Sequence, residues 1–180
     1  MHTLKFNIPT VLTLSRIFLI PFFVLSVYNH PVLGALVFSI ASVTDFLDGY
    51  LARKSGQITK FGIIMDPIAD KFLVISALIV LVDMERLSAF IAITLIVREF
   101  LVTGLRVVAL SKDIIIPAEM GGKLKTTAQI TAILCLILAG TFFDRLPIDL
   151  YDIGMGFIVI ALVLSVSSGI QYTLSFWRKM

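Results

Sequence analysis

The sequence has few charged residues, only one cysteine and only two histidines. Only 15% of its 180 residues are charged and 58% are hydrophobic, whereas soluble domains contain about 25% charged and roughly 45–50% apolar residues. The one cysteine, Cys135, lies in an apolar run and cannot form an internal disulfide, so we expect it to pack among apolar side chains. His2 and His30 have no cysteine or histidine near them, so we do not expect zinc. These shortages exclude a disulfide-stabilised soluble domain and predict an integral membrane protein.

The chain also lacks the features of a processed or multidomain protein. Its first apolar stretch is followed by the turn-forming run Tyr-Asn-His-Pro at 28–31 instead of a small-residue cleavage site, so we expect an uncleaved membrane helix. There is no low-complexity tract, soluble domain or convincing repeat, and we predict one membrane domain over residues 1–180. The net charge of +3 favours anionic lipids and phosphate-bearing substrates as partners over nucleic acid.

Six segments have the length and apolar character of membrane helices, which need about 20 residues to cross a bilayer. They are predicted over residues 8–28, 32–54, 61–82, 87–110, 124–143 and 150–174. Asn7 before Pro9 is a favourable helix start, because asparagine caps a helix and proline suits its first turn. The longest connection, 111–122, contains Pro117 and two glycines. The predicted fold class is an all-α integral membrane protein, a six-transmembrane-helix bundle.

The lysines and arginines in the connections predict the orientation of this bundle. If the N-terminus is inside, nine of them lie in interior segments and two in exterior segments. The interior residues are Lys5, Arg53, Lys54, Lys60, Lys112, Lys123, Lys125, Arg178 and Lys179, and the exterior residues are Arg86 and Arg145. Because positive residues accumulate on the cytoplasmic side, both termini are predicted to be cytoplasmic.

Four aspartates, Asp45, Asp48, Asp66 and Asp70, interrupt the second and third predicted helices. Their spacings of three and four residues put each pair on one helix face. A hairpin that folds about Gln57 brings all four to similar depths toward the cytoplasmic side. Two helices are thus predicted to present two carboxylates each to one cavity.

Carboxylates near lipid are costly, and several of them close together repel each other unless cations lie between them. A dense set of hard oxygen ligands suits magnesium or manganese better than zinc. Four carboxylates can hold two such ions, an arrangement that activates phosphoryl substrates. Gly49 and Ala52 on the aspartate face, and Gly62 in the next helix, would let a nucleotide or another helix approach the backbone, and Arg53 suits phosphate.

Each of these residues also has a simpler interpretation. Gly49 and Ala52 resemble common helix-packing contacts, and Arg53 and Lys54 can mark the cytoplasmic side. Asp45 could take part in helix packing or in a proton relay. Their coincidence at fixed spacing on one side of the membrane favours a metal–phosphate site.

The run Asp-x2-Asp-Gly-x2-Ala-Arg-x8-Gly-x3-Asp-x3-Asp over residues 45–70 resembles the signature of the CDP-alcohol phosphatidyltransferases at all eight of its fixed positions. The resemblance implies a six-helix membrane core, commonly a homodimer, in the bacterial cytoplasmic membrane with the active site facing the cytoplasm. It also implies an enzyme that transfers a phosphatidyl group from a CDP-linked lipid to an alcohol and releases CMP.

By the same resemblance, the four aspartates would bind two divalent ions, Mg or Mn. Asp45 and Asp66 would each touch both ions. Asp48 would bind the first ion and Asp70 the second, and Asp70 would also accept the proton of the alcohol.

The resemblance also assigns the CDP-lipid site. Gly49, Ala52 and Arg53 would line it, and Thr59 would reach the phosphates. A site at the cytoplasmic surface lets the acyl chains of the lipid substrate stay in the bilayer while its nucleotide stays in water.

Further cations predict a second phosphate. Arg98 and Arg106 lie in the fourth predicted helix, and Lys123 and Lys125 begin the fifth after two glycines. A deep arginine needs a partner or a water-filled cavity, and a helix start with glycines and lysines suits an anion. Since these four cations exceed what one metal-bound diphosphate requires, we expect a phosphorylated acceptor. The lysines could instead mark the cytoplasmic side, and Arg98 and the adjacent Glu99 could each satisfy another helix.

Segments 7–16, 98–99 and 122–129 resemble those of bacterial family members that use glycerol-3-phosphate and make phosphatidylglycerophosphate. The resemblance implies CDP-diacylglycerol and glycerol-3-phosphate as substrates, with membrane lipids as surroundings. The same chemistry with inositol phosphate, serine or phosphatidylglycerol is an alternative. A cation-coupled transporter is a much weaker one, because the chain shows neither paired repeats nor helices broken at the midplane.

Overall fold

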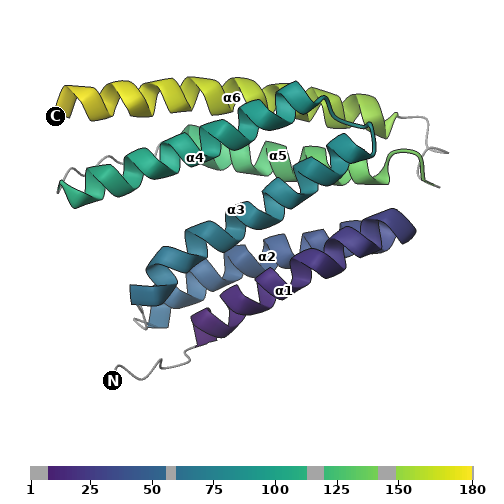
Figure 1. Ribbon diagram of the computed structural model, residues 1–180, viewed down its shortest axis with the longest axis horizontal. Helices are drawn as coiled ribbons and strands as arrows, with labels where there is room; N and C mark the ends of the chain where they lie inside the picture. Colours follow the sequence, from purple (N-terminus) through teal and green to yellow (C-terminus); the bar gives the residue numbers. More distant parts are fainter. Residues whose placement is uncertain (1–7, 56–59, 113–119, 142–148, 180) are drawn as a thin grey trace. The chain divides into compact units, whose positions relative to one another are not determined.

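The computed structural model describes residues 8–55, 60–112, 120–141 and 149–179, and within them the side chains of 18–44, 71–109, 112, 124–141 and 149–178. Over these ranges the chain is helical apart from short turns. The helices are α1 (Ile8–Asn29), α2 (Pro31–Ser55), α3 (Lys60–Asp83), α4 (Ala89–Ser111), α5 (Met120–Leu138) and α6 (Leu150–Lys179), as shown in Figure 1. The predicted all-α class is confirmed for the residues that the structure describes.

The observed helix ends differ from the predicted ones mainly at α5 and α6. α5 begins at Met120, so the glycine pair 121–122 lies in its first turn instead of in the connection. It ends at Leu138, because Gly140 has a φ of 75° and a left-handed residue just past the last turn stops a helix. α6 continues to Lys179, since its last residues include no glycine or proline that would end it.

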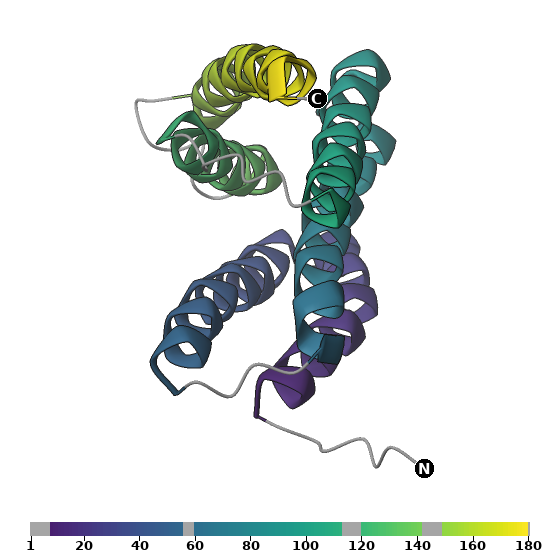
Figure 2. The same cartoon turned by 90° about the vertical axis from the view of Figure 1, so that its left-hand side faces the viewer.

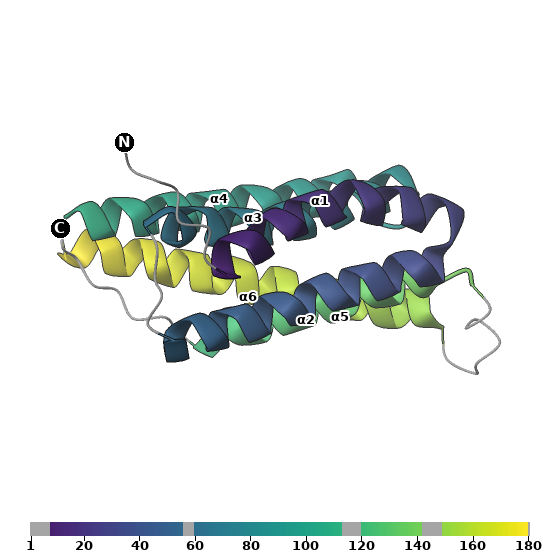
Figure 3. The ribbon, with the colours of Figure 1, turned by 90° about the horizontal axis from the view of Figure 1, so that it is seen from below.

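Residues 1–80 form one compact unit, in which α1 and α2 pack as neighbouring helices (Figure 3). Phe23 of α1 and Phe38 of α2 are fully buried, and their ring centroids are 5.5 Å apart. A Cβ added to Gly34 would lie 2.4 Å from Cγ2 of Val27, so glycine permits a helix approach that a larger residue would prevent. This hairpin fixes the first half of α2, which continues into the half that carries aspartates.

Residues 81–180 form a second unit, in which α6 lies between α4 and α5 (Figure 2). α4 and α6 run in the same direction, and α5 runs opposite to both (Figure 1). Leu95, Leu136 and Ile158, one from each of these helices, are completely buried. A Cβ on Gly154 would lie 2.8 Å from Cγ of Leu136, so this glycine lets α5 approach α6 closely. The apolar packing of the three helices holds their polar residues in fixed positions.

The turn after α3 also closes the end of α5. Glu85 has a φ of 59°, and the amide of Arg86 donates to the carbonyl oxygen of Leu81 at 2.9 Å, which ends α3. The Arg86 Nη1 donates to the carbonyl oxygens of Leu136 at 2.8 Å and Ile137 at 2.9 Å. Carbonyls in the last turn of a helix lack partners within it and lie at the negative end of its dipole. Arg86 therefore stabilises the C-terminus of α5. The sequence predicted only that this residue lies in an exterior connection.

The described helices have the apolar character of membrane segments to different degrees. Among the residues described, α6 over Leu150–Arg178 is the one helix both long and apolar enough to cross a bilayer. Shorter apolar stretches are Phe18–Asn29, Pro31–Thr44 and Leu124–Leu138. Large apolar side chains are also exposed, with Phe18 and Phe90 each 78% exposed. Such outward-facing side chains suit helices surrounded by lipid, where all backbone groups must bond within the helix.

Candidate active site

The aspartates predicted to bind metal lie on two consecutive helices. Asp45 and Asp48 fall within α2, and Asp66 and Asp70 within α3, although their side chains lie outside the described ones. Because an α-helix has 3.6 residues per turn, separations of three and four residues keep each pair on one face. Four residues separate the end of α2 from the start of α3, which keeps these two helix ends close. The helical setting of the motif is confirmed, and the convergence of the four carboxylates stays a prediction.

The residues predicted to contact the CDP-lipid follow the first two aspartates. Gly49, Ala52 and Arg53 lie in the last two turns of α2, and their side chains are outside the described part of the chain. Ala52 is four residues after Asp48, so the two share a helix face. Thr59 lies outside the described residues.

The donor set of α2 and α3 fits hard divalent ions. Neither helix contains a histidine or cysteine, so the nitrogen and sulfur ligands that favour zinc are missing from them. Carboxylate oxygens are the ligands that magnesium and manganese prefer. Among the side chains that the structure describes, no group of three histidine, cysteine, aspartate or glutamate residues could hold a metal. The four motif aspartates supply carboxylate oxygens of this kind.

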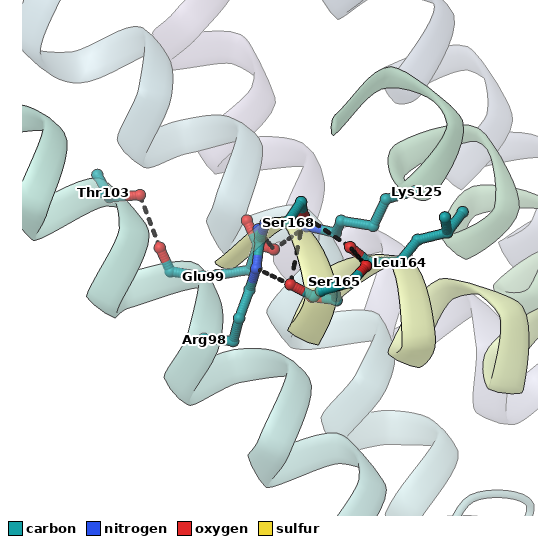
Figure 4. Close-up of polar contacts among 8 residues, drawn as sticks. Arg98, Glu99, Thr103, Lys125, Leu164, Ser165 and Ser168 are labelled. Carbon is teal, nitrogen blue, oxygen red and sulfur yellow. Dashed lines mark hydrogen bonds and ion pairs between the residues drawn. The ribbon is translucent and has the colours of Figure 1, made fainter. Parts of the chain in front are cut away.

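The structure describes the side chains of a second polar cluster, at the contact of α4, α5 and α6 (Figure 4). Arg98 of α4 reaches α6, where its Nε donates to the carbonyl oxygen of Ser165 at 2.7 Å and its Nη2 to Oγ of Ser168 at 2.6 Å. Its Nη1 donates to Oε1 of Glu99 at 3.0 Å. Ser168 in turn donates to the carbonyl oxygen of Leu164 at 2.6 Å. All three guanidinium nitrogens of Arg98 thus donate hydrogen bonds, and two of these bonds join α4 to α6.

Glu99 connects this arginine to α5. The same oxygen, Oε1, that accepts from Arg98 also pairs with Nζ of Lys125. The side chains of Arg98, Glu99 and Lys125 are only 15%, 19% and 5% exposed. Two cations therefore share one carboxylate in a largely buried place. The charges of these three side chains sum to +1, which favours the approach of an anion.

Two buried polar groups in this unit lack a hydrogen-bond partner among the described residues. They are Nε2 of Gln129 and Oγ of Ser165, on residues that are 3% and 0% exposed. Gln129 follows Lys125 by one helical turn on α5 and so lies on the same face. A buried group without a partner costs about 1–3 kcal/mol, and such groups commonly mark a place for water or a polar ligand.

Gly169 of α6 is the residue that lets Arg98 lie against the helix. A Cβ at this position would be 3.3 Å from Nε and 3.4 Å from Cγ of Arg98, tighter than an ordinary contact. A larger side chain would require the Arg98 side chain to shift by a few tenths of an ångström. The small size of Gly169 thus suits the close approach of Arg98 to α6.

The structure brings together two of the four cations predicted for an acceptor phosphate. Arg98 and Lys125 meet across Glu99, to which both are paired, so the adjacent Arg98 and Glu99 do interact although their positions on the helix did not require it. Arg106 is exposed, eight residues further along α4. Lys123 lies at the start of α5, and its side chain is outside the described ones.

Sequence reasoning missed the contribution of α6 to this cluster. The available signal was a pair of serines three residues apart, Ser165 and Ser168, in an otherwise strongly apolar helix. Serines in apolar helices often bond to their own backbone, so the pair alone does not predict an arginine partner. Gln129 lies in the segment 122–129, which resembles bacterial family members, but the sequence predicted no role for it.

Comparisons with known proteins agree over nearly the whole chain. The family profile described as CDP-alcohol phosphatidyltransferase matches residues 6–167. A relative from Bacillus subtilis, named CDP-diacylglycerol–glycerol-3-phosphate 3-phosphatidyltransferase, is 38% identical over 97% of this chain and 97% of its own length. Relatives of the same name are 40% identical in Haemophilus influenzae, over 94% of this chain and 92% of theirs, and 41% identical in Escherichia coli, over 94% of both.

Proposed function

This chain belongs to the CDP-alcohol phosphatidyltransferase family, and we propose that it transfers a phosphatidyl group from CDP-diacylglycerol to glycerol-3-phosphate, giving phosphatidylglycerophosphate and CMP. Family membership makes it a phosphatidyl-transferring membrane enzyme. The observation that carries the choice of acceptor is the set of relatives, which match over 94–97% of the chain and are named for both substrates.

In this proposal Asp45, Asp48, Asp66 and Asp70 hold two divalent ions, Mg or Mn. Two ions bound there would supply positive charge that neutralises the diphosphate of the lipid substrate and makes CMP a better leaving group. Asp45 and Asp66 are assigned as ligands of both ions, Asp48 of the first and Asp70 of the second. The oxygen-only donor set of α2 and α3 supports this assignment.

The reaction exchanges one phosphorus–oxygen bond for another. A hydroxyl oxygen of the acceptor attacks the phosphorus that carries the diacylglycerol, and the bond from that phosphorus to the leaving CMP oxygen breaks. Asp70 takes the hydroxyl proton as general base. Gly49 and Ala52 leave room for the nucleotide beside α2, and Arg53 and Thr59 bond to the phosphates.

The acceptor phosphate is assigned to Arg98, Arg106, Lys123 and Lys125. The two cations paired to the single carboxylate of Glu99 support this assignment, because the net positive charge of these three side chains would attract a phosphate. The three nitrogens of Arg98 are already bonded within the protein, so its part is to maintain the positive potential. Lys125 provides direct contacts with the phosphate, together with Lys123 and Arg106. These two residues are predicted to lie closer to the cytoplasm than Lys125 does.

We further propose six membrane-crossing helices with both termini and the active site on the cytoplasmic side of the bacterial membrane. The nine positive residues in the segments assigned to the interior support this orientation. Exposed apolar side chains on the described helices support contact with lipid. A homodimer is proposed from the resemblance to the family.

CMP release by the purified protein tests this function. The protein is incubated in mixed micelles with CDP-diacylglycerol, magnesium or manganese, and one acceptor at a time. Glycerol-3-phosphate is expected to give rapid CMP release and a lipid product with two phosphates. Release with inositol phosphate, serine or phosphatidylglycerol but not with glycerol-3-phosphate would contradict the assigned acceptor.

A further inference from the structure

The carboxylate of Glu99 occupies a central place in the buried cluster of the second unit. One of its oxygens accepts from Arg98 and from Lys125, which come from different helices. Arg98 is in turn fixed on α6 by two hydrogen bonds, to Ser165 and Ser168. A continuous series of polar contacts therefore runs from α6 through Arg98 and Glu99 to the ammonium group of Lys125 (Figure 4).

We infer that Glu99 is a positioning residue, which holds the ammonium group of Lys125 in place for the acceptor phosphate. This inference rests on the proposed function and adds to it a residue that does not itself touch the substrate. It also explains why Glu99 lies beside Arg98 and Lys125, although a carboxylate by itself would weaken the binding of a phosphate there.

The flexibility of lysine explains why such a residue is needed. A lysine side chain carries its charge at the end of four carbons joined by rotatable bonds, so it loses considerable conformational freedom when it is held in one geometry. Lys125 is nearly buried, with a side chain 5% exposed, and its pairing with Glu99 defines the position of Nζ before a ligand arrives. Preorganisation of this kind lowers the free-energy cost of binding.

The carboxylate does not cancel the positive charge of the site. Arg98 and Lys125 both pair with the one carboxylate of Glu99, so the charges of these three side chains sum to +1. In a place where the three side chains are at most 19% exposed, this charge interacts with a ligand more strongly than it would in water. Glu99 thus fixes Lys125 while the cluster still attracts a phosphate.

A double-mutant cycle between Glu99 and Lys125 tests the inference. Glu99→Gln keeps the size of the side chain but removes its charge, and we expect it to raise the KM for glycerol-3-phosphate about tenfold with a much smaller change in the KM for CDP-diacylglycerol. Lys125→Ala should raise the same KM. If Glu99 acts through Lys125, the double variant should show no further increase over Lys125→Ala alone.

Two more variants separate positioning from loss of fold. Glu99→Asp keeps the charge and should recover part of the affinity for the acceptor. Glu85→Gln removes an exposed carboxylate in the turn after α3 and serves as the matched control, with kinetics like those of the wild type. Glycerol-3-phosphate should also raise the melting temperature of the wild type, and this increase should shrink in Glu99→Gln.

The outcomes separate this inference from the proposed function. If the wild type releases no CMP with glycerol-3-phosphate, the acceptor assignment and the inference are both wrong. If the wild type is active but the effects of Glu99→Gln and Lys125→Ala multiply independently, only the inference is wrong. Equal changes in both KM values, together with a lower melting temperature, would show that Glu99 has a purely structural role and would also overturn it.

Discussion

The guanidinium groups of Arg86 and Arg98 both donate to backbone carbonyls. Arg86 bonds to the last turn of α5, and Arg98 bonds to the carbonyl of Ser165 in α6. Arginine suits this task because its donors form a rigid fork and its charge persists when it is partly buried. The two residues differ in their other partners, since Arg98 also belongs to a charged cluster with Glu99.

The proposed metal ligands give the most direct prediction at this scale. Asp45→Asn or Asp66→Asn should lower kcat/KM at least about 100-fold, since even indirect supports of metal ligands commonly contribute 10–100-fold. Initial rates of CMP release across a range of magnesium concentrations measure the effect. Near-normal activity in either variant would contradict the assignment of these residues as ligands of both ions.

Replacement of Arg86 is expected to change the stability of the protein but not its catalytic activity. Arg86→Ala removes two hydrogen bonds to α5 and should lower the free energy of unfolding by about 1–3 kcal/mol, with kcat unchanged in the folded protein. Thermal unfolding in detergent measures the stability. Lys112→Ala, which removes an exposed positive charge after α4, is the control and should change the melting temperature little. An equal change in both variants would argue against the cap.

At the scale of helices, the approach of α5 to α6 depends on small residues where the helices touch. Gly154 and Gly156 lie two residues apart on α6, but their surroundings differ. A Cβ at position 154 would lie 2.8 Å from Cγ of Leu136 and 3.2 Å from Cβ of Cys135, whereas a Cβ at 156 would meet nothing within 4 Å. The predicted packing role of Cys135 thus corresponds to a half-buried position beside this glycine.

This difference predicts opposite effects of the same substitution. Gly154→Ala should destabilise the protein by about 1–3 kcal/mol, because the added methyl group forces the helices or Leu136 to move. Gly156→Ala should stabilise it by roughly 0.5–1 kcal/mol, because alanine favours a helix more than glycine does. Thermal unfolding of the two variants in the same detergent provides the comparison. A stabilising Gly154→Ala would mean that α5 and α6 are not in close contact at this point.

At the scale of the whole molecule, α4 and α6 differ in how well each suits a membrane by itself. α6 is long and apolar enough to span a bilayer by itself, whereas α4 carries Arg98, Glu99 and Arg106 within its 23 residues. A helix with this many charges is stable in a membrane only if its neighbours satisfy them. Two of the three charges have partners in the second unit.

Accessibility to a membrane-impermeant thiol reagent tests the proposed orientation. In a Cys135→Ser background, a single cysteine replaces Ser88 in the observed connection between α3 and α4, which is proposed to face the exterior, or Lys179 at the end of α6 that is proposed to face the cytoplasm. In intact spheroplasts, Ser88→Cys should react and Lys179→Cys should react only after the membrane is opened. The reverse pattern would contradict cytoplasmic termini.

Much of the fold was predictable because hydrophobic runs and breaks are local features. The start of α1 and the break before Pro31 were close to the predicted limits. The end of α5 was less predictable, because the cap at Gly140 and the contact of Arg86 with Leu136 stop the helix within a sequence that remains apolar. In the candidate site, the sequence predicted the residues that belong to the motif over 45–70. It did not predict that Ser165 and Ser168 of α6 take part.

The sequence by itself determined the helical class, the aspartate motif on α2 and α3, and the family, because these depend on residue types at short spacings along one chain. Only the tertiary structure decided that Arg98 and Lys125 meet across Glu99 and that Arg86 caps α5. Arg86 and Leu136 are 50 residues apart and Arg98 and Ser165 are 67. Their contacts depend on which helices become neighbours when the apolar faces pack, and no local pattern specifies that choice.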